Sequence, residues 1–247
     1  MGTPPSSCGG VHLAIKRKGI KVMMTREEYI ESLRKLDLKV YFMGKRIENP
    51  VDHPIIRPSL NSVAMSYELA QKDEYKELMT ATSNITGKTI NRFCHIHQNA
   101  GDLVKKVKMQ RLMGQKTAAC FQRCVGMDAF NAIYSTTYDM DQELGTEYHK
   151  RFVKYLEMVQ ERDLVVDGAM TDPKGDRSLS PSQQPDPDMF LHITEIRPDG
   201  IVVCGAKAHQ TGAVNSHEHL IMPTQAMKKI RLTLFLLPSK ATLPVSS

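Results

Sequence analysis

The sequence predicts an α+β protein in which a helical first half is followed by a shorter β half. Apolar residues recur at helical spacing up to about residue 164, and short β-branched segments bounded by Pro, Gly and Asp follow. The chain has 247 residues, of which 41% are hydrophobic, so it can bury a core. Helices and strands that are segregated along a chain are typical of layered α+β folds.

The first predicted helix lies at residues 25–36, "TREEYIESLRKL". Thr25 and Glu28 have the spacing of a capping box, in which each side chain accepts a hydrogen bond from the other residue's backbone N–H. Between residues 38 and 47 an alternating pattern predicts a short hairpin or an extended arm, with Gly44 at the bend. The apolar face of the helix comprises Tyr29, Ile30, Leu33 and Leu36.

Further helical patterns predict a helical N-terminal domain at residues 24–164. The longest pattern is expected to break near Gly114. The patterns cover residues 59–71, 73–79, 100–141 and 146–163.

Strand patterns then predict an incomplete β middle domain at residues 165–227, with the turn signal "RPDG" between two of the strands. The patterns cover residues 164–170, 189–196, 200–206 and 217–223.

The two ends of the chain, residues 1–23 and 228–247, follow no regular period. Because the first end leads to two further methionines, Met23 and Met24, we interpret it as an extension that results from a start site assigned too early. The last end, "KKIRLTLFLLPSKATLPVSS", is basic and free of acids, and it resembles an out-of-frame translation.

The formal net charge of +6 comes from these same ends, which carry eight Lys and Arg residues and no acid, so that −2 remains for residues 24–227. No base-reading motif accompanies the positive charge, which argues against a nucleic-acid partner. Five cysteines in a chain of this length are typical of a reducing compartment. No apolar segment approaches the roughly 20 residues of a membrane span. We therefore expect a cytoplasmic protein that does not bind a membrane.

Cys120 and Cys124 form the first candidate site. If both lie on one helix, they share a face about 6 Å apart and could bind one zinc ion or iron–sulfur cluster. The spacing by itself is not specific, because buried free cysteines are common, and a complete site needs two more ligands.

Two segments rich in histidine are further candidates, but a structural role is favoured for each. Cys94, His95 and His97 are dense in ligand atoms yet equally compatible with a polar loop. His217 and His219 lie on one face of a predicted strand, where a solvated or hydrogen-bonded pair is the simpler interpretation.

Two polar segments of the β half are typical of the wall of a cofactor cleft. In "TDPKGDR", Thr171 to Arg177, Lys174 and Arg177 offer cations and the turn offers backbone amides to an anionic ligand such as a phosphate. In "AHQTG", residues 208–212, an imidazole, an amide and a hydroxyl follow a predicted strand. Either segment alone is also compatible with an ordinary surface turn.

Four long segments closely resemble the 4-hydroxybutyryl-CoA dehydratases, flavoproteins that also isomerise vinylacetyl-CoA. They are "VDHPIIRPSLNSVAMSYELAQ", "MQRLMGQKTAACFQRCVGMDAFNA", "VDGAMTDPKGDRSLSPSQQ" and "GAKAHQTGAVNSHEHLIMPT". These enzymes are grouped with flavin-dependent aromatic hydroxylases of the 4-hydroxyphenylacetate 3-monooxygenase type, which share the acyl-CoA dehydrogenase architecture. The resemblance extends from about Met24 to Met227.

The resemblance implies a helical N-terminal domain, a β middle domain and a helical C-terminal domain, with FAD between them, in a homotetramer. It implies that Cys120 and Cys124 are ligands of a 4Fe-4S cluster, and that Gln122 and Thr211 are candidate catalytic residues. The FAD-contacting residues that it implies are Met170, Thr171, Asp172, Pro173, Lys174, Gly175, Asp176, Arg177, His209, Gln210 and Thr211.

The implied reaction converts 4-hydroxybutyryl-CoA to crotonyl-CoA. It removes a hydrogen that the thioester barely acidifies, so acid–base catalysis alone is inadequate. A flavin offers one-electron chemistry, and an open iron position offers a Lewis acid for the departing hydroxyl. Two cofactors in one cleft would meet that need.

The resemblance also implies that the remaining cluster ligands, a His and a Cys, lie beyond the end of this sequence. We therefore expect a truncated N-terminal part that is inactive alone. Two alternatives remain: a flavin-dependent aromatic hydroxylase, which is not expected to keep the cysteine pair, and a non-catalytic helical interaction module.

Overall fold

The computed structural model describes residues 23–198, 200–222 and 238–240. The expectations for residues 1–22 and for most of residues 228–247 lie outside the described residues. The first half of the chain forms, in order, α1 (Arg26–Arg34), β1 (Val40–Phe42), β2 (Lys45–Ile47), η1 (Pro50–Asp52), α2 (Arg57–Ala70), α3 (Asp73–Met79), β3 (Thr80–Thr82), β4 (Thr89–Asn91), η2 (Arg92–Cys94), α4 (Ala100–Thr117), α5 (Cys124–Leu144) and α6 (Tyr148–Arg162).

Strands dominate the remainder, so the predicted order of a helical part followed by a strand-rich part is confirmed. Its elements are β5 (Val166–Ala169), η3 (Pro181–Gln183), β6 (His192–Arg197), β7 (Gly200–Cys204), η4 (Ala213–Asn215), β8 (Glu218–Ile221) and β9 (Pro238–Lys240). None of the described helices is both long enough and apolar enough to cross a membrane. The expected domain limits and the relation to acyl-CoA dehydrogenases stay predictions.

Helix α1 begins as its sequence predicts. The Thr25 side chain accepts a hydrogen bond from the Glu28 N–H, and the Glu28 carboxylate accepts one from the Thr25 N–H, so the capping box is formed. The apolar face packs against α2, and the hairpin of β1 and β2 that follows bends at Gly44, whose φ is +74°.

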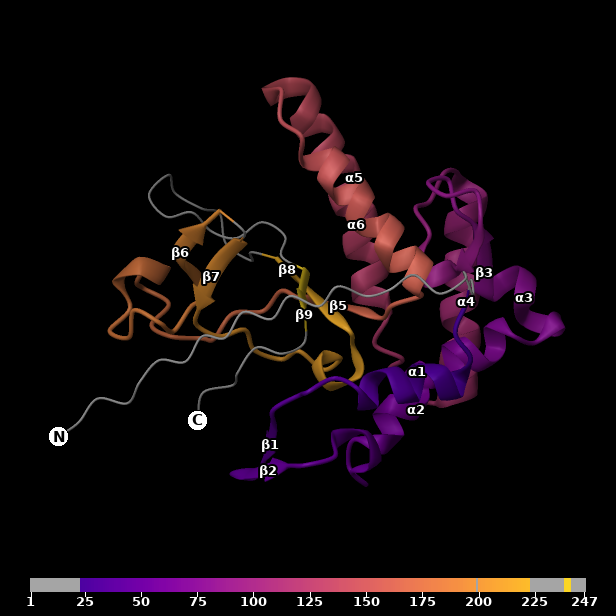
Figure 1. Cartoon of the computed structure of the whole chain (residues 1–247), viewed down its shortest axis with the longest axis horizontal. Helices are drawn as coiled ribbons and strands as arrows, with labels where there is room; N and C mark the ends of the chain where they lie inside the picture. The colour runs from indigo at the N-terminus through magenta and orange to yellow at the C-terminus, as the bar shows by residue number, and fades with distance from the viewer. Residues whose placement is uncertain (1–22, 199, 223–237, 241–247) are drawn as a thin grey trace.

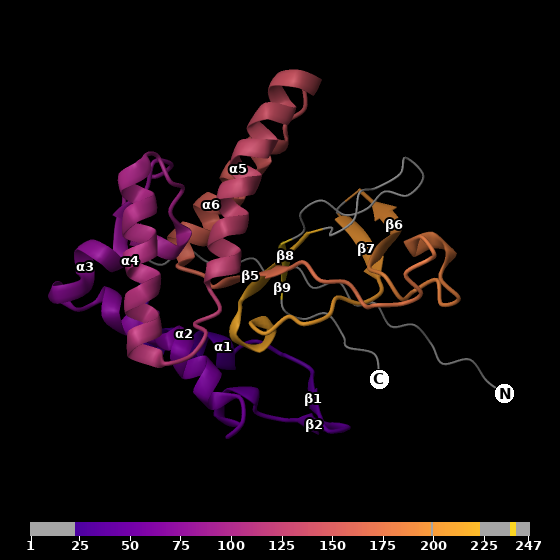
Figure 2. The ribbon, with the colours of Figure 1, turned by 180° about the vertical axis from the view of Figure 1, so that it is seen from behind.

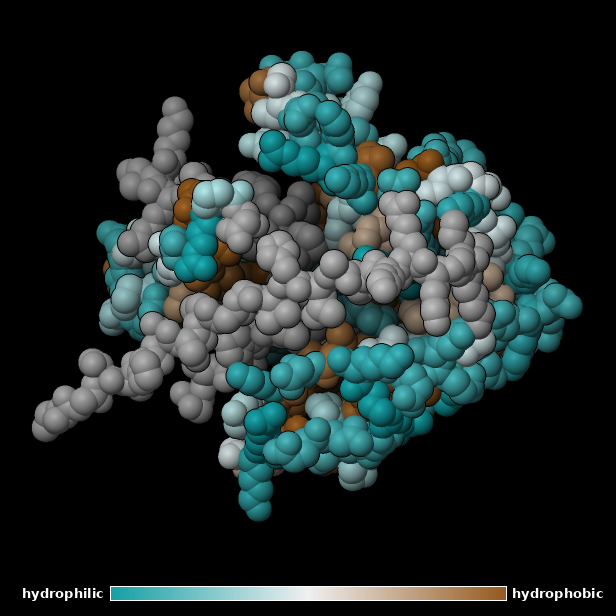
Figure 3. Space-filling view, viewed as in Figure 1, coloured by the Kyte–Doolittle hydropathy of each residue, from teal (hydrophilic) through white to brown (hydrophobic). Residues whose placement is uncertain are grey.

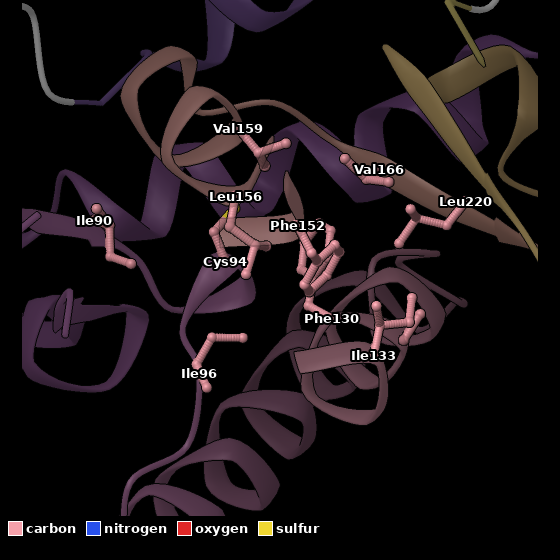
Figure 4. Close-up of a cluster of buried hydrophobic side chains, with 11 residues drawn as sticks. Ile90, Cys94, Ile96, Phe130, Ile133, Phe152, Leu156, Val159, Val166 and Leu220 are labelled. Atoms are coloured by element: carbon pink, nitrogen blue, oxygen red, sulfur yellow. The ribbon is translucent and has the colours of Figure 1, made fainter. Parts of the chain in front are cut away.

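Helices α5 and α6 form an antiparallel hairpin that projects from the molecule (Figures 1 and 2). Its base packs into a core to which both halves of the chain contribute, because Phe130 and Leu156 lie beside Val166 of β5 and Leu220 of β8 (Figure 4). On the face that Figure 3 shows, the described surface of the helices is mainly hydrophilic. The β half is therefore anchored to the helices through a shared apolar core.

The described β half contains a three-stranded sheet and a separate pair of strands. β5 and β8 are parallel, with Asp167 opposite His219, and β9 extends this sheet on the other side of β8. β6 and β7 form an antiparallel hairpin with an irregularity between Ile193 and Glu195. The long connection from β5 to β8 carries both segments that the sequence assigns to a cofactor cleft.

The sequence places Cys120 and Cys124 on one helix that breaks near Gly114, and the structure contradicts this. Helix α4 continues through Gly114 to Thr117, and α5 begins at Cys124. The chain leaves the helical path at Ala118, whose φ is +50°, and the loop of residues 118–123 follows. Tertiary contacts of that loop outweigh the helical preference of its residues, which is worth only tenths of a kcal/mol per residue.

Candidate functional site

The two cysteines occupy a loop and a helix start. Cys120 is exposed in the loop of residues 118–123, and Cys124, the first residue of α5, is half-buried. Burial raises the pKa of Cys124, and the nearby Cys120 thiolate raises that pKa further. Backbone N–H groups of Cys124 and Val125 at the helix start stabilise the thiolate and act in the opposite direction. The two thiols are thus neighbours, although they do not lie on successive turns of a helix.

Arg123 anchors this loop to the helical half. Its guanidinium lies 4.8 Å from the ring centroids of both Tyr67 and Phe93, and its Nη1 donates a hydrogen bond of 2.8 Å to Ser66 Oγ. Only 2% of its surface is exposed. A cation held between two aromatic faces is stabilised by their π electrons, so the loop is fixed from the inside.

Gln122 points to the β half. Its backbone is left-handed, with φ +59°, and it is 7% exposed. Its Oε1 accepts a hydrogen bond of 2.7 Å from Asn215 Nδ2, and Asn215 also donates to Ser59 Oγ at 2.6 Å. Asn215 ends η4, which begins two residues after Thr211. A direct hydrogen bond therefore joins the cysteine loop to η4, which follows the "AHQTG" segment.

The "TDPKGDR" and "AHQTG" segments lie side by side at the end of β5. The N–H of Ala208 donates to the carbonyl of Thr171 at 2.9 Å. The Nζ of Lys207 lies 2.6 Å from Asp172 Oδ1 and also donates to the carbonyl of Met170 at 2.9 Å. Both side chains of the Lys207–Asp172 pair are largely buried, so the pair fixes the two segments to one another.

Gln184 supports the turn of residues 171–177. Its Nε2 donates to the carbonyl of Asp176, its Oε1 accepts from the Asp176 N–H, and its side chain lies within 2.6 Å of where a Cβ on Gly175 would stand. Lys174 and Arg177 are exposed, and neither forms an ion pair with another described residue. The turn thus presents two cations on a supported backbone.

The segment of residues 209–212 is also held in a defined shape. His209 has a φ of +58°, His209 and Thr211 are exposed, and Gln210 donates a hydrogen bond to the carbonyl of Ala208. A Cβ on Gly212 would stand 3.0 Å from the Asp167 carboxylate, so the turn packs closely on β5. The side chains of His209 and Thr211 are therefore exposed, whereas Gly212 packs against β5.

The first histidine-rich segment meets the cysteine loop at Cys94, whose Sγ lies 3.9 Å from Arg123 Nη2. Cys94 and His95 are buried rather than on a polar loop, and His95 Nε2 lies 3.2 Å from Asp102 Oδ2. Burial raises the pKa of Cys94 to about 12, which makes it a neutral thiol of the core. No three metal-ligand side chains cluster anywhere in the described ranges.

His217 and His219 contact other side chains and the backbone of the fold. His217 Nδ1 accepts a hydrogen bond from the Val165 N–H, and its Nε2 lies 2.7 Å from Ser32 Oγ. His219 Nδ1 lies 3.9 Å from Asp167 Oδ2, and burial lowers the pKa of His219. His217 is therefore hydrogen-bonded, whereas His219 Nδ1 is buried without a hydrogen-bond partner among the described residues.

Asn215 and Arg123 are the site residues that sequence reasoning misses. Both stand inside the segments that carry the resemblance, next to residues that were singled out, and an Arg between Gln122 and Cys124 in an otherwise apolar pattern is a readable signal. Their partners lie 93 and 57 residues away in the chain, so no local pattern could reveal the contacts.

Comparison with known proteins agrees with this arrangement. Residues 25–238 match the family described as 4-hydroxyphenylacetate 3-hydroxylase N terminal. The chain is 69% identical over 206 residues to the 4-hydroxybutyryl-CoA dehydratase/vinylacetyl-CoA-Delta-isomerase of Clostridium aminobutyricum, an alignment that covers 83% of this chain and 42% of that protein. It is 28% identical over 209 residues to an FADH(2)-dependent monooxygenase of Burkholderia cepacia, with 80% and 39% covered.

The structure of an oxygen-tolerant archaeal 4-hydroxybutyryl-CoA dehydratase from N. maritimus superimposes with a TM-score of 0.80 at 54% identity. That superposition covers 84% of this chain and 41% of the archaeal chain. The 247 residues thus span about two-fifths of the length of the relatives that they match.

Proposed function

Because the chain belongs to the family of 4-hydroxyphenylacetate 3-hydroxylase N-terminal regions, we propose that it supplies the cluster-binding loop and one flavin-binding wall of a 4-hydroxybutyryl-CoA dehydratase. The reaction of that enzyme would convert 4-hydroxybutyryl-CoA to crotonyl-CoA and isomerise vinylacetyl-CoA. The observation that carries the proposal is the hydrogen bond between Gln122 and Asn215, which ties the cysteine loop to a residue four positions after Thr211. A site for two cofactors requires that proximity.

The residues fit an FAD along the two adjoining segments. Met170 to Arg177 and His209 to Thr211 are mostly exposed, and Lys174 and Arg177 would bind the phosphates of the dinucleotide. His209 and Thr211 would hydrogen-bond the ring system from the neighbouring turn. A relative at 28% identity is named for its dependence on FADH(2), which supports a flavin here.

The cysteine loop fits one side of a 4Fe-4S cluster. Two neighbouring thiols, one of them at a helix start that stabilises thiolate, are suitable for two of the four ligands. Since the described residues offer no cluster of three ligands, we propose that the chain alone does not complete the site and is inactive by itself. A homotetramer that acts on an acyl-CoA in the cytoplasm remains part of this proposal.

In the loaded site, a flavin supplies one-electron chemistry and an iron centre supplies a Lewis acid. The protein's own groups would bind and orient the cofactors and the substrate. Lys174 and Arg177 hold anionic groups, Gln122 offers an amide between the two cofactor-binding segments, and Thr211 offers a hydroxyl from the facing turn. We propose Gln122 and Thr211 as the residues nearest the reacting atoms.

Cofactor binding by the full chain tests the proposal. FAD affinity, measured by flavin fluorescence, should fall at least about tenfold in a K174E/R177E double variant, since two charge-assisted contacts are lost and reversed. FAD affinity should be unchanged in a C120S/C124S variant. If K174E/R177E binds FAD like the native chain, the flavin wall is assigned wrongly.

Anaerobic reconstitution with iron and sulfide tests the cluster. Bound iron should stay well below four per chain, and it should disappear in C120S/C124S but not in the control C204S, which removes a partly buried thiol of β7. A full cluster that survives the loss of both cysteines would contradict the proposal. A hydroxylase, the alternative, predicts native flavin binding and no iron that depends on the cysteines.

A further inference from the structure

We propose that Asn215 is a positioning residue that turns the side-chain amide of Gln122, so that Gln122 offers its NH₂ group rather than its carbonyl to the ligand. This inference rests on the proposed function for the identity of the ligand, an acyl thioester whose oxygen atoms accept hydrogen bonds. The orientation itself rests only on contacts among described residues.

Asn215 cannot turn or move easily. It is fully buried, and its Nδ2 donates to Gln122 Oε1 at 2.7 Å and to Ser59 Oγ at 2.6 Å. Its backbone carbonyl accepts a hydrogen bond of 2.7 Å from the Tyr29 hydroxyl, and the Tyr29 ring is stacked on Tyr67 at 4.7 Å. Helices α1 and α2 therefore both hold Asn215 in addition to Gln122.

The chemistry of the two amides then fixes the orientation of Gln122. A primary amide has an oxygen that only accepts and a nitrogen that only donates. Because the NH₂ group of Asn215 points to Gln122, the oxygen of Gln122 must face Asn215. The Gln122 NH₂ group is left over, and it has no hydrogen-bond partner elsewhere in the described part of the chain.

Two local costs accompany this geometry. Gln122 has a left-handed backbone with φ +59°, a conformation that costs a residue with a side chain about 1 kcal/mol or more. Asn215 Oδ1 is buried and has no partner among the residues that the structure describes, at a cost of about 1–3 kcal/mol. The surrounding structure thus tolerates two local costs at one hydrogen bond, the bond that joins the cysteine loop to residues 209–215.

The consequence is a hydrogen-bond donor of fixed direction beside the two thiols. An NH₂ group suits a carbonyl or hydroxyl oxygen of an acyl thioester, and it does not suit a cationic or purely donating group. Gln122 is the residue that touches the ligand, and Asn215 acts through it.

Hydrogen exchange of side-chain amides in the full chain without cofactors tests the orientation directly. The signals are observed by NMR after labelling of Asn and Gln, and they are assigned by their loss in the N215D and Q122E variants. In the native chain, the Asn215 NH₂ protons should exchange at least about 100-fold more slowly than those of Gln122, because only the former are both buried and bonded.

The N215D variant makes the sharpest comparison. A carboxylate cannot donate, so the Gln122 amide should turn over and donate to it, and the Gln122 NH₂ exchange should slow by at least about tenfold. N61D is the matched control on α2, where Asn61 Oδ1 accepts from Arg26, and it should leave Gln122 unchanged. In S59A, one Asn215 proton should exchange faster while Gln122 again stays the same.

The inference is overturned if the native Gln122 NH₂ group is already protected, or if folded N215D leaves its exchange unchanged. Should N215D fail to fold, the native chain and S59A decide the question. These measurements involve no flavin, iron or substrate, so failure of the proposed function would leave their outcome unaffected.

Discussion

Single residues of the cysteine loop face in two directions. Arg123 points into the helical half between two aromatic rings, whereas Gln122 points to Asn215 of the β half. Cys120 and Cys124 flank these two residues, so the position of the thiols depends on both anchors. Both neighbouring side chains are buried, and each is bonded to a different part of the chain.

Replacement of Arg123 by Ala should destabilise the chain by about 3 kcal/mol, since it removes two cation–π contacts and a hydrogen bond and leaves a cavity. R123M should recover part of the loss, because its side chain still fills the space between the rings. Urea unfolding measures both values. R111A, at an exposed position of α4, is the control, and an R123A variant as stable as R111A would refute the anchoring role.

At the scale of elements, the start of α5 determines where the thiols lie relative to the sheet. A Cβ on Gly126 would stand only 2.0 Å from the carbonyl oxygen of Val166, and a Cβ on Gly168 would stand 2.4 Å from a methyl group of Val125. Helix α5 and strand β5 therefore touch backbone to backbone. Residues larger than glycine at either position would push Cys124 away from the turn that follows β5.

G126A should destabilise the chain by about 3 kcal/mol or more, because the backbone atom that it meets cannot rotate away. G114A, inside α4, is the matched control: no atom lies within 4 Å of its added methyl, so it should stabilise the helix by about 0.5–1 kcal/mol. Thermal unfolding followed by circular dichroism distinguishes the two. Equal melting temperatures would contradict the close approach of α5 to β5.

At the scale of the whole molecule, buried hydrogen bonds join the helical half to the start of the β half. The Tyr29 hydroxyl donates to the Asn215 carbonyl, the Tyr67 hydroxyl donates to the Asp163 carbonyl, and His217 bridges α1 and the backbone of Val165. These contacts tie α1 and α2 to η4 and to the residues that precede β5. They also place two titratable groups where water cannot solvate their charge.

These two groups should give opposite pH dependences of stability. Burial lowers the pKa of His217 from 6.5 to about 4. The contribution of this residue to the free energy of unfolding is therefore complete above pH 6.5 and is lost as the pH falls towards 4. Burial raises the pKa of Asp163 from 3.8 to about 7, so its contribution is complete below pH 3.8 and is lost as the pH rises through 7.

Single variants separate the two effects. D163N keeps an acceptor for the Met24 N–H, and its free energy of unfolding relative to the native chain should rise between pH 4 and pH 7. H217N keeps an acceptor for the Val165 N–H. The amount by which its free energy of unfolding lies below that of the native chain should shrink by up to about 3 kcal/mol as the pH falls from 6.5 to 4. Parallel curves for the native chain and both variants would show that neither group titrates in this range.

The sequence by itself determined most of the elements. The capping box of Thr25 and Glu28, the bend at Gly44 and the change of period near Leu164 are local signals, and the structure follows each of them. The resemblance also identified the segments that form the candidate site. Such features can be read from the sequence because a cap, a turn or an amphipathic face depends on residues only a few positions apart.

Only the tertiary structure decided how those segments meet. The end of α4 at Thr117, the turn of Arg123 into the core and the pairing of Gln122 with Asn215 do not follow from local pattern. Helical preference at these residues amounts to tenths of a kcal/mol, whereas burial of an aromatic-sandwiched arginine and of hydrogen-bonded amides involves several kcal/mol. Where distant contacts outweigh local preference in this way, the partner residue decides the conformation, and it stands tens of positions away in the chain.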